Sequence, residues 1–173
     1  KPINSPEDLK GLKVRVQPSP TAIEMTKYLG ANPIPIPYGE LYTALQQGVV
    51  DAAENNMTAL TLSRHGEVAK YFSLDEHTMV PDVLVISSIA WDKLSEEQQA
   101  AIEQAALEST LYMRELWSEA ENKEIDKIEK LNVSIIEVDK KPFQVAVQPM
   151  FDKLKVDDPE TFEVIENIKL LAD

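Results

Sequence analysis

Apolar side chains along the chain recur with two periodicities, one typical of strands and one typical of helices. Residues 12–17 alternate apolar and polar side chains, which predicts a half-buried strand, and a helix follows over residues 20–29. Prolines alternate with isoleucines over residues 33–37, which predicts a short extended edge strand. Because the predicted strands and helices alternate and no two strands form a hairpin, the fold class is α/β with a largely parallel sheet.

A helix and a strand then follow in close succession. Apolar residues at helical spacing predict a helix over residues 38–48, and Gly48 stands where that helix ends. Residues 49–54 predict a short strand that leads directly into the polar pair Asn55 and Asn56. An open α/β sheet usually binds its ligand where a strand ends beside the start of a helix. We therefore expect the binding site in this part of the chain.

The second half of the chain is dominated by one long predicted helix. Ser95 and Gln98 form a capping-box pattern, and neither Gly nor Pro interrupts the chain before about Leu131. At about 1.5 Å per residue, such a helix would be roughly 50 Å long. Its apolar stripe consists of Ile102, Ala105, Ala106, Ser109, Met113, Leu116, Trp117, Ala120, Ile125 and Ile128. The stripe could form a coiled coil, but its irregular spacing and its alanines favour packing along a globular body.

Shorter elements are predicted on both sides of this helix. They are a turn at residues 5–8, a helix over 57–64, an apolar segment over 68–72, a strand rich in Val and Ile over 78–88, a strand over 132–138, a helix over 142–155 that bends or restarts at Pro149, and a last helix over 158–171. They continue the alternation of strands and helices that defines the α/β class.

Composition and charge narrow the possible functions. A length of 173 residues allows one domain, or one lobe with parts of a second. The 17 basic and 30 acidic residues give a formal net charge of −13, which excludes nucleic acid as an expected partner. An anionic ligand stays possible, because one buried arginine can outweigh a distant negative surface. The absence of cysteine does not decide between the periplasm and the cytoplasm.

Enzyme chemistry has no candidate residues in this sequence. Only two histidines are present, His65 and His77, and neither has a spaced partner for nucleophilic catalysis or for metal binding. We interpret His65 as a residue at a helix end and His77 as a polar side chain that finds a hydrogen bond. We therefore expect no catalytic residue, no metal ion and no cofactor.

Four residues near the predicted strand ends are candidates for ligand binding, and each has a purely structural alternative. Arg15 could bind an anion or be a surface charge on the polar face of its strand. Tyr38 could contact a ligand or pack on the helix that it begins. Asn55 could donate and accept hydrogen bonds to a ligand, or it could be the N-cap of the next helix. Glu54 could reach a ligand hydroxyl, but we first interpret it as a structural or helix-dipole carboxylate.

The motif PYGELYTALQQGVVDAAEN, at residues 37–55, resembles a signature of the solute-binding proteins of tripartite ATP-independent periplasmic (TRAP) transporters. The upstream run SPEDLKGLKVRV and the downstream runs EVAKYFSLDEH and WDKLSEEQQAAIEQAA continue the resemblance in the same order. It covers essentially the whole chain and begins at the middle of the family members. We therefore expect this chain to be the C-terminal half of such a protein.

The resemblance implies both a domain plan and roles for the candidate residues. Residues 1–80 and 121–173 would form a ligand-binding α/β lobe, and residues 81–120 would cross to a second lobe that is largely absent. Arg15 matches the arginine that pairs with the ligand carboxylate in the family. Tyr38 matches an aromatic residue against the ligand, and Asn55 matches a ligand-contacting asparagine.

The function implied by the resemblance is capture of a small molecule in the periplasm rather than catalysis. Two lobes would close on an organic acid, either a sugar acid or a dicarboxylate, and deliver it to TRAP membrane subunits. The alternative is a helical oligomerisation or scaffold module without a ligand. We also expect the 173-residue chain to self-associate through an uncovered apolar face. That face comprises Val83, Val85, Ile102, Ala106, Met113 and Trp117.

Overall fold

Two small parallel sheets form the centre of an α/β lobe in the computed structural model, which describes residues 1–171 without the side chains at positions 125, 126 and 129. The first sheet has the order β2-β1-β3, with β1 (Lys13–Val16) between β2 (Asn32–Pro35) and β3 (Ala52–Ala53). The second sheet pairs β4 (Tyr71–Leu74) with β5 (Ser134–Glu137). Every one of these pairings is parallel. The predicted fold class and the edge position of the proline-rich strand are therefore confirmed.

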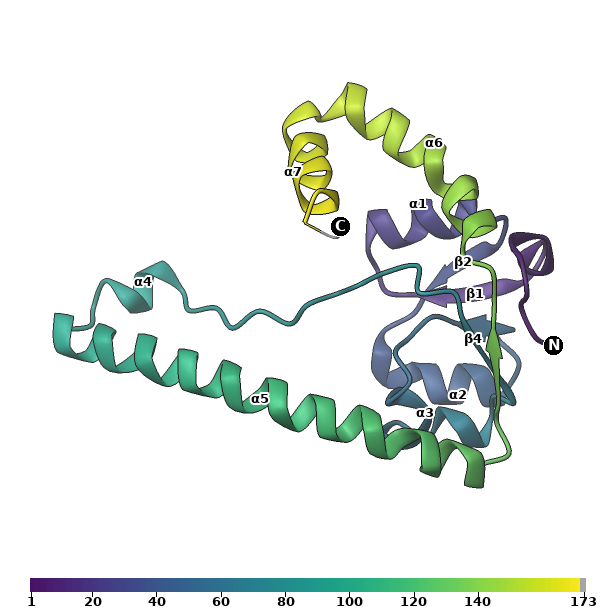
Figure 1. Cartoon of the computed structure of the whole chain (residues 1–173), viewed down its shortest axis with the longest axis horizontal. Coiled ribbons are helices and arrows are strands. Elements are labelled where there is room, and N and C mark those ends of the chain that lie inside the picture. Colours follow the sequence, from purple (N-terminus) through teal and green to yellow (C-terminus); the bar gives the residue numbers. More distant parts are fainter. Residues whose placement is uncertain (172–173) are drawn as a thin grey trace.

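Helices and single turns connect the strands and cover the sheets (Figure 1). They are η1 (Pro6–Leu9), α1 (Pro20–Tyr28), η2 (Tyr38–Glu40), α2 (Leu41–Gln46), α3 (Ala59–Leu62), η3 (His65–Glu67), α4 (Ser88–Trp91), α5 (Glu96–Lys130), α6 (Lys141–Asp157) and α7 (Pro159–Lys169). The capping box is present at α5, because the Ser95 backbone N–H donates to Gln98 Oε1 at 2.9 Å and the Gln98 N–H donates to Ser95 Oγ at 3.3 Å. The long helix is thus confirmed, although Ile125 of its stripe lies outside the described side chains.

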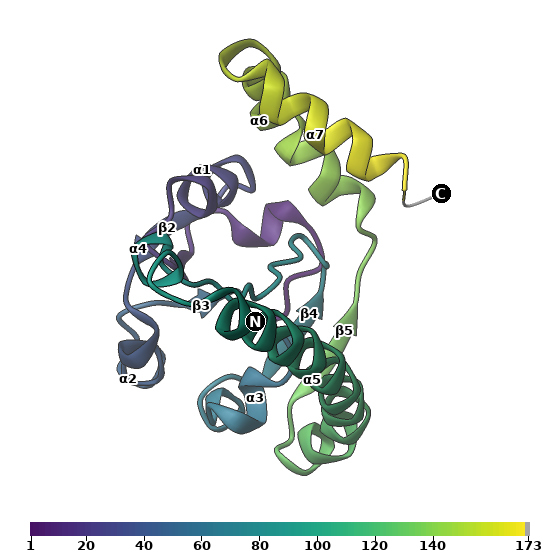
Figure 2. The ribbon, with the colours of Figure 1, turned by 90° about the vertical axis from the view of Figure 1, so that its left-hand side faces the viewer.

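The three-stranded sheet is covered on both faces (Figure 2). Helices α1 and α6 cover one face, where Val14, Met25 and Phe143 belong to one buried cluster. Helix α2 covers the other face through a second cluster that includes Leu41 and Val50. Because β1 is the central strand and both faces of the sheet are covered there, Val14, Arg15 and Val16 are all buried although the sequence alternates. Lys13, at the start of the strand, is exposed.

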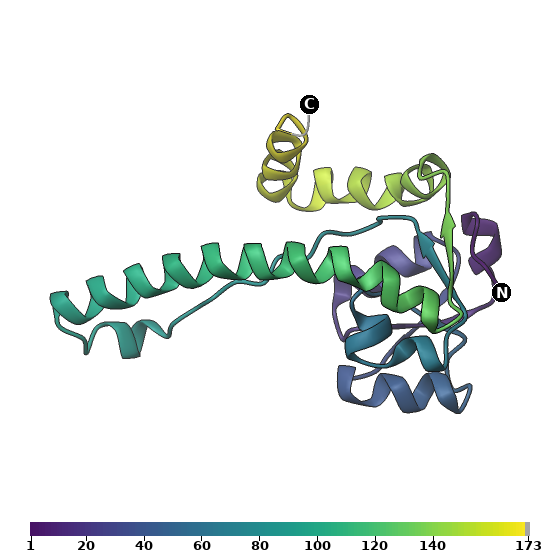
Figure 3. The same cartoon turned by 60° about the horizontal axis from the view of Figure 1, so that its bottom comes forward.

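The long helix joins this lobe only at its C-terminal end. There Ile128 is fully buried against Leu60 and Val133, in a cluster between α3, α5 and the second sheet. The N-terminal part of α5 projects away from the lobe together with α4 (Figures 1 and 3). No helix within residues 1–171 combines the length and the apolar character that a membrane crossing requires.

The predicted strand over residues 78–88 is wrong. Residues 75–87 run as an extended segment that pairs with no strand in the described part of the chain, and α4 begins at Ser88. The side chains of Val83 and Val85 are 75% and 79% exposed. A run of Val and Ile fits a pleated sheet, but it becomes a strand only where a neighbouring strand supplies hydrogen-bond partners, and none lies beside this run within residues 1–171.

Two other helix predictions need comment. Of the two alternatives at Pro149, a restart is excluded, because α6 continues through this residue as one helix. The predicted helix over 57–64 is reduced to α3, because Arg64 takes a left-handed conformation with φ 60° and the separate turn η3 follows it. This sharp joint between α3 and η3 lies beside the site described next.

Candidate functional site

Charged and aromatic side chains meet where the parallel strands end. Arg15 comes from the end of β1, Tyr38 follows β2, and Glu54 follows β3. Asp75 follows β4, and His77 lies two residues further on. The charges of these groups act on one another: Glu54 is influenced by Arg15, His77 and Asp75. The carboxyl ends of parallel strands are the usual ligand position in such sheets, so this cluster is the candidate site.

Arg15 is the central residue of the cluster, and it is only 1% exposed. The structural alternative for Arg15, a surface charge on the polar face of its strand, is therefore wrong. Its Nε donates to the main-chain oxygen of Ile36 at 2.8 Å, whereas its buried Nη2 has no hydrogen-bond partner among the described residues. Burial lowers the pKa of Arg15, against the opposing effect of Glu54 and Tyr38, but a guanidinium stays charged at neutral pH. A buried cation with an unpaired donor is suited to an anionic acceptor, above all a carboxylate.

Tyr38 lies over this guanidinium. The Arg15 Cζ atom is 5.7 Å from the centroid of the Tyr38 ring, which is a cation–π geometry. The Tyr38 hydroxyl is 2.5 Å from Ser63 Oγ, and its ring meets the His65 ring edge-on, with centroids 5.8 Å apart and an interplanar angle of 64°. Tyr38 is 46% exposed, so part of the ring is available to a ligand.

Asn55 does not cap the following helix. Its Oδ1 accepts the backbone N–H of Asn56 at 2.8 Å, and the N-cap position of α3 is held by Thr58. The Asn55 amide nitrogen has no hydrogen bond to any residue that the structure describes, and it remains a donor.

Burial raises the pKa of the half-buried Glu54 against the opposing charges of His77 and Arg15. Glu54 therefore belongs to the cluster electrostatically rather than standing free on the surface.

The two histidines contact different members of the cluster: His65 packs against Tyr38, and His77 contacts Asp75. The prediction that His77 finds a hydrogen bond is confirmed, because its Nδ1 is 2.8 Å from Asp75 Oδ1. Burial lowers the pKa of His77, but the hydrogen bond to Asp75 and the charges of Asp75 and Glu54 outweigh it, so the pKa is raised. His65 is buried at 6% exposure, and both burial and the charge of Arg15 lower its pKa.

Sequence reasoning did not identify Ser63, His65 or Asp75 as part of the site. Ser63 and His65 lie 25 and 27 positions after Tyr38, and no motif links them to it. The sequence indicates for His65 only a position at a helix end, and His65 does begin η3. Its approach to Tyr38 depends on the left-handed turn at Arg64, which nothing in the local sequence indicates.

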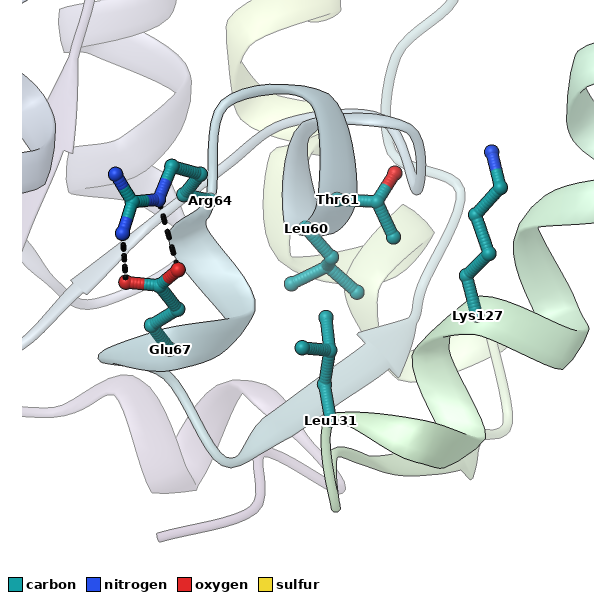
Figure 4. Close-up of a pocket in the computed structure, with 6 residues that line it drawn as sticks. All are labelled: Leu60, Thr61, Arg64, Glu67, Lys127 and Leu131. Carbon is teal, nitrogen blue, oxygen red and sulfur yellow. Dashed lines mark hydrogen bonds and ion pairs between the residues drawn. The ribbon is translucent and has the colours of Figure 1, made fainter.

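A separate cavity of about 170 Å³ lies between α3 and the C-terminal end of α5 (Figure 4). It is lined by Leu60, Thr61, Arg64, Glu67, Lys127 and Leu131. Its cations are already paired: Arg64 Nε donates to Glu67 Oε1 at 2.7 Å, and Lys127 donates to Glu124 Oε1 at 2.6 Å. The unpaired donor of Arg15 therefore marks the ligand site better than this cavity does.

Comparison with known proteins shows one consistent relationship. The family model for the bacterial extracellular solute-binding proteins of family 7 matches residues 1–157. The chain is 48% identical over 155 residues to the uncharacterized protein YiiZ of Salmonella typhimurium, covering 89% of this chain and 47% of that protein. It is 39% identical over 157 residues to the 2,3-diketo-L-gulonate-binding periplasmic protein YiaO of Escherichia coli, covering 88% of this chain and 48% of that protein. The chain thus spans about half the length of these relatives.

Solved structures of TRAP periplasmic solute-binding proteins have the same fold. The protein from Xanthobacter autotrophicus, with bound β-D-galacturonate, superposes with a TM-score of 0.93 at 45% identity, covering 98% of this chain and 57% of that one. The protein from Chromohalobacter salexigens, with bound D-glucuronate, also gives a TM-score of 0.93, at 38% identity, covering 97% of this chain and 56% of that one.

Proposed function

The chain belongs to the bacterial extracellular solute-binding proteins of family 7, and we propose that it is the C-terminal half of a two-lobed periplasmic protein that captures a sugar acid for a TRAP transporter. The family match over residues 1–157 supports the transport role. The bound galacturonate and glucuronate of two similar structures support a hexuronate as the ligand. The observation that carries the proposal is the buried Nη2 of Arg15, which has no partner among the described residues.

The chemistry of a hexuronate fits the candidate side chains. Its carboxylate would accept hydrogen bonds from Arg15 and satisfy the unpaired Nη2. Its hydroxyls would accept from the Asn55 amide and donate to Glu54, while the exposed part of Tyr38 would cover an apolar face of the sugar. A dicarboxylate is the second candidate, but its fewer hydroxyl groups would make less use of Asn55 and Glu54.

The proposed action is binding without chemistry. Residues 1–80 and 121–173 would form one lobe, and residues 81–120 would belong to the second, so that the ligand is enclosed when the lobes close. The closed form would then be recognised by the membrane subunits. We propose no enzymatic step, because the cluster holds groups that bind an acid rather than a nucleophile with its base.

Calorimetry on the full-length two-lobed protein tests this function. D-glucuronate and D-galacturonate should bind and should raise the melting temperature, whereas D-glucose, which lacks the carboxylate, should do neither. Succinate separates the sugar-acid proposal from the dicarboxylate candidate, since it carries carboxylates without the sugar hydroxyls. If no organic acid changes the melting temperature, the chain is better explained as a helical scaffold module, and the capture function is wrong.

A further inference from the structure

Tyr38 is held by contacts from a distant part of the chain rather than by its own element. It begins η2, a single turn of three residues, and its side chain is 46% exposed. Neither a short turn nor partial packing restricts an aromatic ring to one orientation. The restriction comes from Ser63, whose Oγ is 2.5 Å from the Tyr38 hydroxyl, and from His65, whose ring meets the Tyr38 ring edge-on.

The joint that carries Ser63 and His65 is itself tightly packed. Arg64 between them has a left-handed backbone with φ 60°, which turns the two neighbouring side chains toward η2. A Cβ atom on Gly66 would lie 2.8 Å from a side-chain carbon of Leu131 and 3.0 Å from the main-chain oxygen of Leu60. Gly66 therefore packs closely against α3 and against Leu131, the residue that follows α5, and this contact anchors the joint beside the ligand-facing ring.

We propose that Ser63 and His65 are positioning residues that fix the ring of Tyr38 over Arg15 before ligand binds. This proposal rests on the proposed function, because it deepens the role of the same site. With its hydroxyl held by Ser63, Tyr38 presents its ring to the ligand in one orientation. The side chain is thereby preorganised, and the ligand does not have to order it on binding. A structural role alone would stabilise the fold without changing affinity.

A double-mutant cycle on the full-length two-lobed protein tests the role of Ser63, with D-glucuronate as the ligand and calorimetry as the readout. Ser63→Ala and Tyr38→Phe should each weaken binding about three- to tenfold, because each removes the same hydrogen bond. The double variant should be no weaker than either single variant. Additive losses would overturn the proposal, and so would a much larger loss for Tyr38→Phe, which would mean that the hydroxyl contacts the ligand directly.

Tyr42→Phe is the matched control for this cycle. The Tyr42 hydroxyl donates to Glu67 Oε2 at 2.9 Å, so it also joins the segment of Tyr38 to the segment of Ser63 without contacting the Tyr38 ring. The control variant should keep wild-type affinity. A loss equal to that of Ser63→Ala would mean that any tie between these segments matters, and the specific role of Ser63 would be wrong.

The role of His65 is tested with two variants that differ in whether a ring is kept, and the positioning of Tyr38 is tested by a measurement that needs no ligand. His65→Phe keeps a ring against Tyr38 and should keep affinity within about twofold, whereas His65→Ala should lose it, with both melting temperatures recorded. In NMR spectra of the 173-residue chain, the Tyr38 ring resonances should move in Ser63→Ala and stay in Tyr42→Phe. Unmoved resonances would overturn the positioning role even if the ligand were misassigned, whereas a wild-type protein that binds no acid would overturn only the proposed function.

Discussion

The Nε atom of Arg15 donates to the main-chain oxygen of Ile36 at 2.8 Å, and this bond fixes the guanidinium at the end of β1. Ile36 follows the edge strand β2, so the neighbouring strand orients the arginine of the central one. The guanidinium lies over the ring of Tyr38, and its buried Nη2 remains unpaired among the described residues. This geometry leaves one oriented, buried donor of Arg15 for an anionic acceptor, as the proposed function requires.

The first prediction follows from this geometry. Arg15→Lys in the full-length protein should weaken uronate binding by more than tenfold, about 1.4 kcal/mol or more, because an ammonium group cannot make two parallel hydrogen bonds to a carboxylate. Arg64→Lys is the matched control, since Arg64 is paired with Glu67 at the surface and should not affect affinity. Calorimetry with unchanged affinity for Arg15→Lys would remove this residue from the site.

The sequence predicted the positions of the helices and strands better than it predicted their burial and their pairing with other strands. Periodicity and caps located β1, α1 and the long helix α5, because those signals are local. Alternation misplaced Arg15, since a central strand is covered on both faces whatever its pattern. The run at residues 78–88 failed for the opposite reason: its composition suits a strand, but no partner strand lies beside it in the described chain.

The candidate site was predictable where a residue stands at a strand end. Arg15 and Glu54 follow that rule, and the structure brings them together with Tyr38. Ser63 and His65 could not be predicted, because their position depends on one left-handed residue and on packing across the chain. The local sequence therefore predicts where the strands end, whereas the contacts that orient the side chains around those ends can be seen only in the tertiary structure.

The proposed ligand contact of Asn55 is tested by replacing its amide with a carboxylate of nearly the same shape. Asn55→Asp should reduce uronate affinity through repulsion of the ligand carboxylate, and it should leave the melting temperature of the ligand-free protein nearly unchanged. An aspartate could still accept the Asn56 N–H, so the local turn is kept. Asn56→Asp, one position further on and exposed, adds the same charge as a control. Equal affinity for wild type and Asn55→Asp would exclude Asn55 from ligand contact.

The two histidines should titrate on opposite sides of the ordinary value of 6.5. The pKa of His77 is raised, so its contribution to stability is present below the unfolded pKa and is lost as pH rises through the folded pKa. The pKa of His65 is lowered, so its contribution is present above the unfolded pKa and is lost as pH falls through the folded pKa. NMR titration of the two ring C2 protons measures both midpoints in one sample.

The Asp75→Asn variant tests whether Asp75 causes the raised pKa of His77. Asp75→Asn should lower the midpoint of His77, because it removes the negative charge on the carboxylate 2.8 Å from Nδ1. The midpoint of His65 should stay in place and is the internal control. Coincident midpoints in the wild-type protein, or the reverse order, would contradict the electrostatic description of the cluster.

The last prediction concerns the apolar groove between the extended segment and the first half of α5. The groove has a volume of about 450 Å³, and its apolar lining includes Leu84, Ile86, Trp91, Ile102 and Ala106. Leu84 is 77% exposed, and the exposed fractions of Met79, Val80, Val83 and Val85 lie between 75% and 92%. Soluble monomers rarely expose a contiguous apolar surface beyond a few hundred Å². We therefore expect the isolated 173-residue chain to self-associate through this face, by pairing its long helices or by exchanging them.

Light scattering over a range of concentrations measures this association. Ile102→Glu places a charge in the groove and should weaken association by at least tenfold, about 1.4 kcal/mol, because a buried carboxylate without a partner is costly. Val156→Glu adds the same charge at an exposed apolar position of α6, outside the groove, and should leave association unchanged. A wild-type chain that stays monomeric at every concentration would contradict the prediction. It would mean that the long helix folds back and covers the apolar segment itself.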